Sequence, residues 1–250
     1  MIVGAQLYTL RDFCKNLNGF AEALKKAADI GYTTVQVSGT CTYDPQWLKG
    51  ELDRNGLRCV LTHTPPDRIL NQTKQVCEEH KAFGCNRIGL GFYDMGSRDP
   101  GNTCKQFYEL FQPAAQTIRE NGCYFMYHNH HFEFQWYEGK TILRWLAKKF
   151  APEELGFILD TFWVQAGGAN PAEYIREFSG RVPCIHLKDF AYDRKIAVIG
   201  EGNINFDAVL MEAEKSGTEY LLVEQDDCYG EDPFDCLKRS YKNLCAMGLK

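Results

Sequence analysis

A group of histidines follows a mostly apolar segment in the middle of the chain. Residues 123–134 read CYFMYHNHHFEF, so the apolar segment leads directly into His128, Asn129, His130 and His131, with Glu133 close behind. Half of the chain's 6 histidines therefore lie within four positions. Imidazole groups at the end of a buried strand are typical of a metal site or a proton-transfer site rather than of a core.

Four further ionisable residues end short apolar segments elsewhere in the chain. They are His63 after CVLT, Asp160 after GFIL, His186 after VPCI and Glu224 after YLLV. Because an unpaired buried charge is costly, such groups are expected to face one another or to share a cation. Asp160, His186 and Glu224 lie at the same offset in successive strands, and their donor atoms suit Mn²⁺, Zn²⁺, Co²⁺ or Mg²⁺. The alternative for each residue alone is a hydrogen bond to a loop backbone.

Strand-like and helix-like segments alternate along the whole chain, and they must position these residues. The expected strands are residues 2–8, 32–37, 57–62, 87–90, 123–127, 156–159, 182–187 and 220–223, and the expected helices are residues 19–30, 45–55, 69–83, 103–121, 140–149, 171–178, 206–216 and 233–247. Alternation of this kind predicts an α/β protein, a (β/α)8 barrel formed by residues 1–250 as a single domain. An open doubly wound sheet is less favoured, because no G-x-G-x-x-G and no P-loop follows a strand.

Composition excludes several classes of function. The chain of 250 residues has a net charge of −5 and no run of Lys and Arg, which argues against a nucleic-acid or anionic-membrane surface. No signal peptide pattern opens the chain, and no apolar run reaches the roughly 18–20 residues of a membrane helix. The 11 cysteines form no C-x-x-C pair, and we interpret them as reduced thiols of a cytoplasmic protein.

Motifs along nearly the whole chain resemble those of the xylose isomerase-like TIM barrels, the sugar phosphate isomerase/epimerase group. The motifs are QLYTLRD, LTHTPPDR, YHNHHFEF, LDTFWVQAGG, HLKDF, GEGNINF and LLVEQD. The resemblance implies one divalent metal ion held by a Glu, an Asp, a His and a second Glu. Asp160, His186 and Glu224 match three of these ligands directly. His128 stands where many relatives have the first Glu, so Glu133 is the expected fourth ligand and His128 the alternative ligand or a substrate contact.

The resemblance also implies a reaction, the isomerisation or epimerisation of a sugar or sugar phosphate. The carbonyl and hydroxyl of a hydroxyketone would chelate the metal, which makes the neighbouring C–H bond acidic. Glu133 and Glu224 are the expected catalytic pair, one removing the proton and the other returning it through a metal-stabilised enediolate. The expected partner is thus a small carbohydrate, and a homo-oligomer is compatible with the sequence.

Five residues are expected to contact the substrate: His63, His128, His130, Trp163 and Lys188. Trp163 stands where the ketose 3-epimerases have a substrate-binding His, and its ring suits stacking on a sugar or packing alone. Lys188 follows His186 by two residues and would steady a developing oxyanion, unless it is exposed or ion-paired. His63 reaches the substrate or serves as a structural strand-end residue.

Three other functions were weighed against the isomerase. A lyase or dehydratase, like inosose dehydratase or the enzymes that cleave 3-keto-glycosides, would use the same metal site, with a histidine as acid for the leaving oxygen. A non-catalytic sugar-binding barrel is less favoured because the full set of ligand types is present. A nuclease like endonuclease IV would need more histidines and a basic face.

Overall fold

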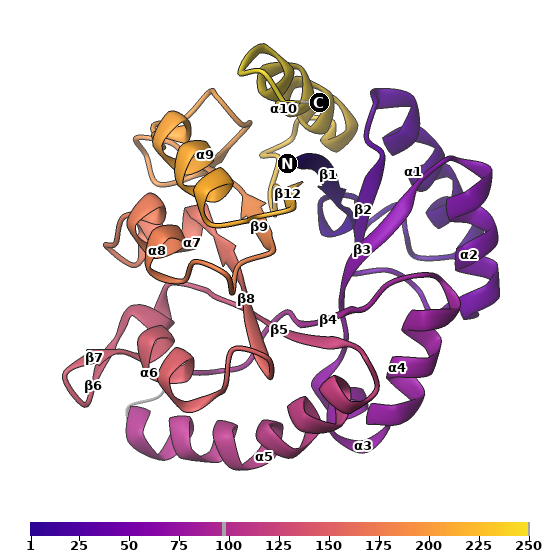
Figure 1. Ribbon diagram of the computed structural model, residues 1–250. Helices are drawn as coiled ribbons and strands as arrows, with labels where there is room; N and C mark the ends of the chain where they lie inside the picture. The colour runs from indigo at the N-terminus through magenta and orange to yellow at the C-terminus, as the bar shows by residue number, and fades with distance from the viewer. Residues whose placement is uncertain (97–98, 250) are drawn as a thin grey trace.

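The computed structural model describes residues 1–96 and 99–249, and its core is a closed barrel of parallel strands (Figure 1). Around the barrel the strand order is β1-β12-β9-β8-β5-β4-β3-β2, and β1 pairs with both β12 and β2. The strands are β1 (Ile2–Gln6), β2 (Thr34–Val37), β3 (Arg58–His63), β4 (Arg87–Leu90), β5 (Tyr124–His128), β8 (Leu155–Asp160), β9 (Cys184–Leu187) and β12 (Tyr220–Val223). This closure confirms the predicted (β/α)8 barrel and excludes the open sheet.

The helices surround the barrel and run between successive strands (Figure 1). They are α1 (Leu17–Ile30), α2 (Pro45–Arg54), α3 (Pro66–Asn71), α4 (Thr73–Ala82), α5 (Pro100–Glu120), α6 (Ile142–Lys149), α7 (Thr161–Ala166), α8 (Pro171–Glu177), α9 (Phe206–Lys215) and α10 (Pro233–Ala246), with two 3-10 turns, η1 (Leu7–Leu10) and η2 (Phe132–Phe134). None of the helices in the described part of the chain is long and apolar enough to cross a bilayer.

Four helices begin with the same local sequence, an Asp or Asn followed by proline. Asp44, Asp99, Asn170 and Asp232 are N-caps whose side chains accept backbone N–H groups of the first turn. Proline fits the next position because its φ is already helical and the missing N–H has no helical partner there.

Several expected boundaries were wrong. The predicted helix over residues 69–83 is two helices, α3 and α4, which meet at Gln72. Residues 140–141 belong to a hairpin, β6 (Trp136–Tyr137) with β7 (Lys140–Thr141), and a second hairpin joins β10 (Asp189–Phe190) to β11 (Ile196–Ala197). Strand pairs of two residues are too short for periodicity to reveal.

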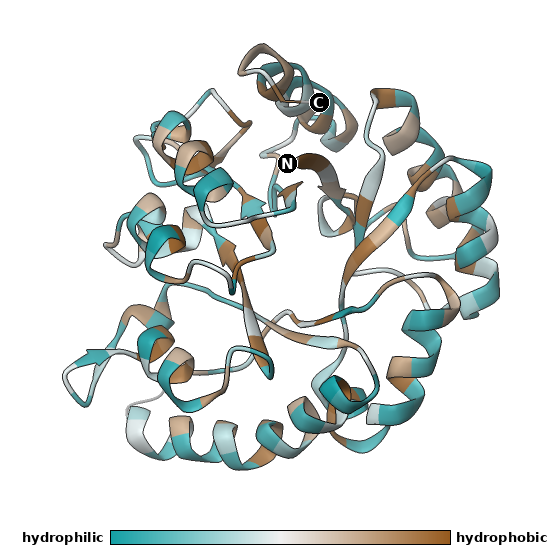
Figure 2. Ribbon diagram, viewed as in Figure 1, coloured by the Kyte–Doolittle hydropathy of each residue, from teal (hydrophilic) through white to brown (hydrophobic). Residues whose placement is uncertain are grey.

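The interior of the barrel changes from apolar to polar along its axis. Brown apolar segments line the strands and the inward helix faces, whereas the outer helix faces are mostly teal (Figure 2). A small cluster inside the barrel contains Val60, Leu61, Met126, Ile158, Cys184, Tyr220 and Leu222. Gln6, Gln36 and His186, closer to the carboxyl ends of their strands, are fully buried polar residues. This polar layer supports the candidate site.

Candidate active site

The carboxyl ends of the barrel strands bring the predicted residues together. His128 ends β5, Asp160 ends β8, His186 lies in β9, and Glu224 directly follows β12. All four are buried, and one ligand atom from each lies within 4.8 Å of the ligand atoms of the others. Parallel strands of a barrel place such residues on one face. The cluster is therefore a direct product of the strand register.

The shortest contacts in this cluster join an imidazole to a carboxylate. His128 Nε2 lies 3.2 Å from Asp160 Oδ2. His186 Nδ1 lies 2.9 Å from Glu224 Oε2 and 3.8 Å from Asp160 Oδ2. The other carboxylate oxygen of Asp160 accepts the backbone N–H of Trp163 and caps α7. Oδ2 of Asp160 therefore remains directed toward the two imidazoles.

Groups from the first half of the barrel fix the two imidazole rings. The Nδ1 atom of His128 donates to the carbonyl of Gly91 at 3.0 Å, and Nε2 of His186 lies 2.6 Å from Oε1 of Gln36. An N–H that donates to a carbonyl leaves the other ring nitrogen with a free lone pair in the neutral imidazole. The ring nitrogens that face the carboxylates, Nε2 of His128 and Nδ1 of His186, therefore carry the free lone pair whenever the ring is neutral.

This arrangement fits a divalent cation. His128 Nε2 lies 3.2 Å from Asp160 Oδ2 while Nδ1 of the same ring donates to Gly91, so a neutral His128 would offer its free lone pair to a cation bound beside Asp160. His186 Nδ1 and Glu224 Oε2 have no hydrogen-bond partner among the described residues. Two imidazoles with two carboxylates form a donor set suited to Zn²⁺, Mn²⁺ or Co²⁺. The chain's own residues could hold one such ion.

The carboxylates of the cluster are held in their ionised form. Burial alone would raise the pKa of Asp160, but the charge of Lys188 and the neighbouring histidines hold it well below its usual range. The same groups lower the pKa of Glu224. For His186, burial would lower the pKa, yet Glu224 and Asp160 outweigh it and raise the pKa. The cluster thus concentrates negative charge in a buried space and requires positive charge nearby.

Lys188 supplies that positive charge within the described residues. Its ammonium group lies 3.0 Å from Asp160 Oδ2, 3.0 Å from Glu224 Oε2 and 2.9 Å from Asp226 Oδ2, and the residue is 1% exposed. Of the alternatives stated for Lys188, an exposed or an ion-paired side chain, the structure shows the ion-paired one. Its side chain also passes the ring of Trp163, with Nζ 5.7 Å from the ring centroid.

Glu133, the expected fourth ligand, lies outside the cluster. His128, the alternative ligand, lies inside it. One Glu133 oxygen accepts the Tyr127 hydroxyl at 2.5 Å, and the other accepts the backbone N–H of His130 at 2.8 Å. The 3-10 turn η2 directs the side chain back under its own loop, which sequence spacing could not reveal. Burial raises the pKa of Glu133 to about 8, although both hydrogen bonds oppose the shift.

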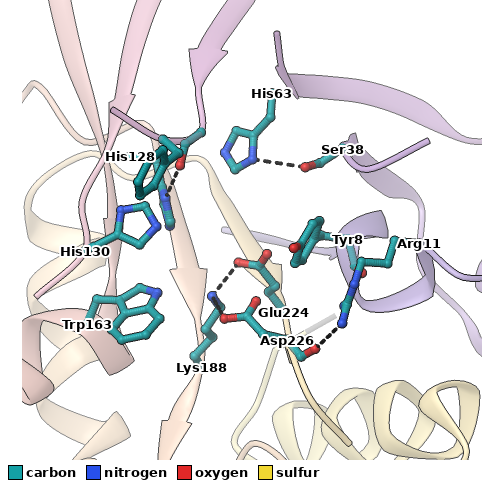
Figure 3. A pocket seen from close by; sticks show the side chains of 12 residues that line it. Tyr8, Arg11, Ser38, His63, His128, His130, Trp163, Lys188, Glu224 and Asp226 are labelled. Carbon is teal, nitrogen blue, oxygen red and sulfur yellow. Dashed lines mark hydrogen bonds and ion pairs between the residues drawn. The ribbon is translucent and has the colours of Figure 1, made fainter. Parts of the chain in front are cut away.

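A cavity of about 450 Å³ opens above the cluster, and the five expected substrate contacts all line it. Figure 3 shows His128, His130 and Trp163 on one side, Tyr8 and Arg11 on the other, and Lys188, Glu224 and Asp226 between them. His63 lines the cavity beside Ser38, whose hydroxyl lies 3.0 Å from its Nδ1. The cavity volume falls within the range of small-molecule sites.

Two of the histidines that line this cavity have an unpartnered ring nitrogen. His63 Nε2 and His130 Nδ1 are buried and have no hydrogen-bond partner in the described part of the chain. Burial lowers the pKa of His130 to about 3 and that of His63 well below its usual value, so both rings are neutral near pH 7. Such nitrogens can accept from or donate to substrate hydroxyls.

Several residues of the candidate site were not predicted from the sequence. Gln6 donates to Glu224 Oε1 at 2.8 Å, and Gln36 contacts His186 across the barrel. Arg11 stacks over the Tyr8 ring and donates to the backbone carbonyl of Asp226 at 2.8 Å. Gln6 ends an apolar strand in the same way as the predicted residues do, and that was the available signal. Gln36 lies within β2 rather than at its end, so it offered no comparable signal.

Comparison with known proteins gives the family of the chain and structures with a similar fold. The family model for the xylose isomerase-like TIM barrel matches residues 24–240, and the chain belongs to that family. A sugar phosphate isomerase/epimerase from Parabacteroides distasonis superposes with a TM-score of 0.84 at 22% identity, covering 98% of this chain and 93% of that one. No curated protein matches the chain in sequence.

Two other solved structures have similar folds at lower identity. A D-allulose 3-epimerase from Methylomonas sp. has a TM-score of 0.73 at 14% identity and covers 98% of this chain and 97% of its own. A probable 3-DHS dehydratase from Bacillus anthracis has a TM-score of 0.76 at 14% identity, covering 98% and 99%. At these identities the likeness concerns the fold.

Proposed function

We propose that this protein is a divalent-metal-dependent isomerase or epimerase that acts on a sugar by moving a proton next to a carbonyl group. The observation that carries the proposal is the convergence of His128, Asp160, His186 and Glu224 under a cavity of about 450 Å³. The names of similar structures, a sugar phosphate isomerase/epimerase and a D-allulose 3-epimerase, support the same class of substrate.

The four clustered residues are the proposed ligands, with His128 in place of Glu133. A bound divalent cation would polarise a substrate carbonyl and make the neighbouring C–H bond more acidic. Gln6 orients Glu224 from the neighbouring strand β1, and Gln36 orients His186 from β2. Fixed rings and carboxylates of this kind need little reorganisation when a substrate binds.

Glu224 is the proposed proton acceptor, and His130 lies on the other side of the cavity. The lowered pKa of Glu224 keeps its carboxylate ionised, so it could take the proton from the carbon next to the carbonyl and then return it. The neutral ring of His130 could carry a hydroxyl proton from one substrate oxygen to the other, accepting it on one nitrogen and passing it on. Glu133 then holds the backbone of His130 rather than acting itself.

The remaining lining residues would hold and shield the sugar. Trp163 presents an aromatic face, which suits the apolar face of a sugar ring. His63 offers an unpartnered nitrogen for a hydroxyl group. Phe92 is 56% exposed at the cavity edge and contacts the His130 ring edge-on, with 5.3 Å between ring centroids. Together these groups would exclude water from the reacting carbon.

Solvent deuterium exchange tests this proposal. Wild-type protein supplied with each of Mn²⁺, Zn²⁺, Co²⁺ and Mg²⁺ would be incubated in D₂O with a panel of aldoses, ketoses and their phosphates. We expect one isomer pair to gain deuterium at the carbon next to the carbonyl. Glu224→Gln and His130→Gln should each slow the exchange by about 100-fold or more. Glu219→Gln, at an exposed ion pair with Arg87, is the matched control.

A lyase is the second candidate, favoured by the likeness to a probable dehydratase. After Glu224 has taken the proton from the carbon next to the carbonyl, it could give that proton to an oxygen that leaves from the adjacent carbon. In the exchange experiment a lyase would release water or a sugar fragment. Exchange without release supports the isomerase, and metal-loaded protein inactive on every substrate of the panel argues against both.

A further inference from the structure

The cluster already contains a cation, the ammonium group of Lys188. It contacts Asp160 Oδ2 and Glu224 Oε2, each at 3.0 Å. These are the oxygens that lie next to Nε2 of His128 and Nδ1 of His186. A divalent ion bound by the four proposed ligands would need the same two oxygens. Lys188 and the ion therefore compete for them.

The three carboxylates around Lys188 do not hold it in the same way. Only the contact with Asp226 Oδ2, at 2.9 Å, has the geometry of a hydrogen bond. Glu224 Oε2 lies 3.0 Å from the ammonium group but has no hydrogen-bond partner in the described part of the chain. Asp226 is also the most accessible of the three, with 27% of its side chain exposed. Asp226 can retain the ammonium group when the other two are taken.

Charge balance supports two alternative cations for this cluster. Asp160, Glu224 and Asp226 carry three negative charges, and Lys188 neutralises one of them. A buried set of carboxylates without any cation would be strongly destabilised. With a divalent ion present, the three negative charges match the ion and Lys188 together. The ammonium group lowers the electrostatic cost of the buried carboxylates when no metal is bound, and it opposes metal binding.

We propose that Lys188 is an internal counter-ion that holds the cluster together without metal, and that Asp226 retains its ammonium group when a divalent ion takes Asp160 and Glu224. The Lys188–Asp226 pair thereby sets the affinity of the site for metal. This inference rests on the proposed metal site. It assigns Asp226 a role that is distinct from those of the four ligands.

Metal affinity of variants tests this role without any assay of activity. The dissociation constant for Mn²⁺ would be measured by electron paramagnetic resonance of free Mn²⁺ and by calorimetry on metal-stripped protein. Lys188→Met keeps an unbranched side chain that is one atom shorter and removes the charge, so we expect Mn²⁺ to bind about tenfold tighter or more. Lys195→Met, which removes an exposed lysine paired with Asp193, is the matched control and should change nothing.

Asp226→Asn provides a second, independent variant. It removes the carboxylate that retains the ammonium group, so Lys188 stays paired with Asp160 and Glu224. Mn²⁺ should therefore bind several-fold more weakly. The weakening should be smaller in the K188M background, because no ammonium group is left to relocate. If Lys188→Met does not fold, Asp226→Asn alone tests the proposal. Mn²⁺ binding to Asp226→Asn as tight as to wild type would overturn it.

Thermal unfolding supplies the remaining readout. Metal-free Lys188→Met should unfold at a lower temperature than metal-free wild type, and Mn²⁺ should restore much of the difference. Unchanged Mn²⁺ affinity in Lys188→Met overturns the counter-ion role while leaving the metal site intact. Absence of Mn²⁺ and Zn²⁺ binding by wild type and variants alike overturns the metal site itself, and the counter-ion role with it.

Discussion

Glu133 is a buried carboxyl group whose oxygens are both held by its own loop. The Tyr127 hydroxyl and the His130 backbone N–H donate to it, and it is 0% exposed. Burial disfavours the ionised form, so its pKa rises to about 8 from the ordinary 4.5. Near neutral pH the group is therefore mostly protonated, and its two neighbours keep the His128–His130 segment in place.

Glu133→Gln should change how stability depends on pH. A carboxyl group with a raised folded-state pKa contributes its full stability below its unfolded pKa, near 4.5, and loses it as the pH rises through about 8. Gln does not ionise, so the variant should gain about 2–4 kcal/mol on wild type between about pH 5 and pH 9. Urea unfolding across this range measures the change. Parallel curves for the two proteins would contradict the burial of an ionisable group here.

Asp189 organises an entire connection, the loop between β11 and α9. Its Oδ2 accepts the N–H groups of Gly200 and Gly202, and its Oδ1 accepts those of Phe190 and Ile204. A Cβ atom at Gly202 would lie 2.4 Å from Asp189 Oδ1, so only glycine permits this approach. The GEG segment of the sequence is thus a turn wrapped around one carboxylate next to Lys188.

Asp189→Asn should loosen this loop. An amide group offers one acceptor oxygen where the carboxylate offers two, so two of the four N–H groups lose their partner. We expect a loss of about 2–4 kcal/mol in unfolding free energy and faster hydrogen exchange over residues 199–204. Exchange measured by mass spectrometry would show it, with Asp207→Asn, in the first turn of α9, as a control. Protection as strong as in wild type would show that the loop is held by other contacts.

The barrel as a whole is closed by β1, and its candidate ligands come from four different strands. His128 and Glu224 are 96 residues apart in sequence, yet each offers a ligand atom within 4.8 Å of the other's. A cation held by both would link most of the second half of the barrel. Binding to the folded state alone stabilises that state by mass action.

Metal loading should therefore raise the melting temperature of the wild-type protein. At a metal concentration about 100 times the dissociation constant, binding contributes about 2.7 kcal/mol, which shifts the melting temperature of a chain of this size by roughly 5–11 °C. EDTA should reverse the shift, and Asp160→Asn should abolish it. Differential scanning calorimetry provides the measurement. A shift that persists in Asp160→Asn would place the ion elsewhere.

The sequence was sufficient for the barrel and for most of the site, for a physical reason. Apolar strands that end in an ionisable residue predict both the parallel sheet and the face on which its side chains meet, as Asp160, His186 and Glu224 show. The sequence left Glu133 and His128 as alternatives for the fourth ligand, and only His128 lies in the cluster, because the direction of a side chain in a 3-10 turn depends on local backbone angles. The contact of Gln36 with His186 spans 150 positions and needed the closed barrel.

The proposed ligands and the groups that hold them lie in different halves of the barrel, which limits how halves from different proteins can be combined. Every proposed ligand lies in the half from β5 onward, whereas Gln6, Gln36 and the carbonyl of Gly91, which hold Glu224, His186 and His128, lie in the half before it. A chimera that joined this second half to a foreign first half would inherit the donor atoms without the partners that fix their protons. Its metal affinity would fall even if the hybrid barrel closed perfectly.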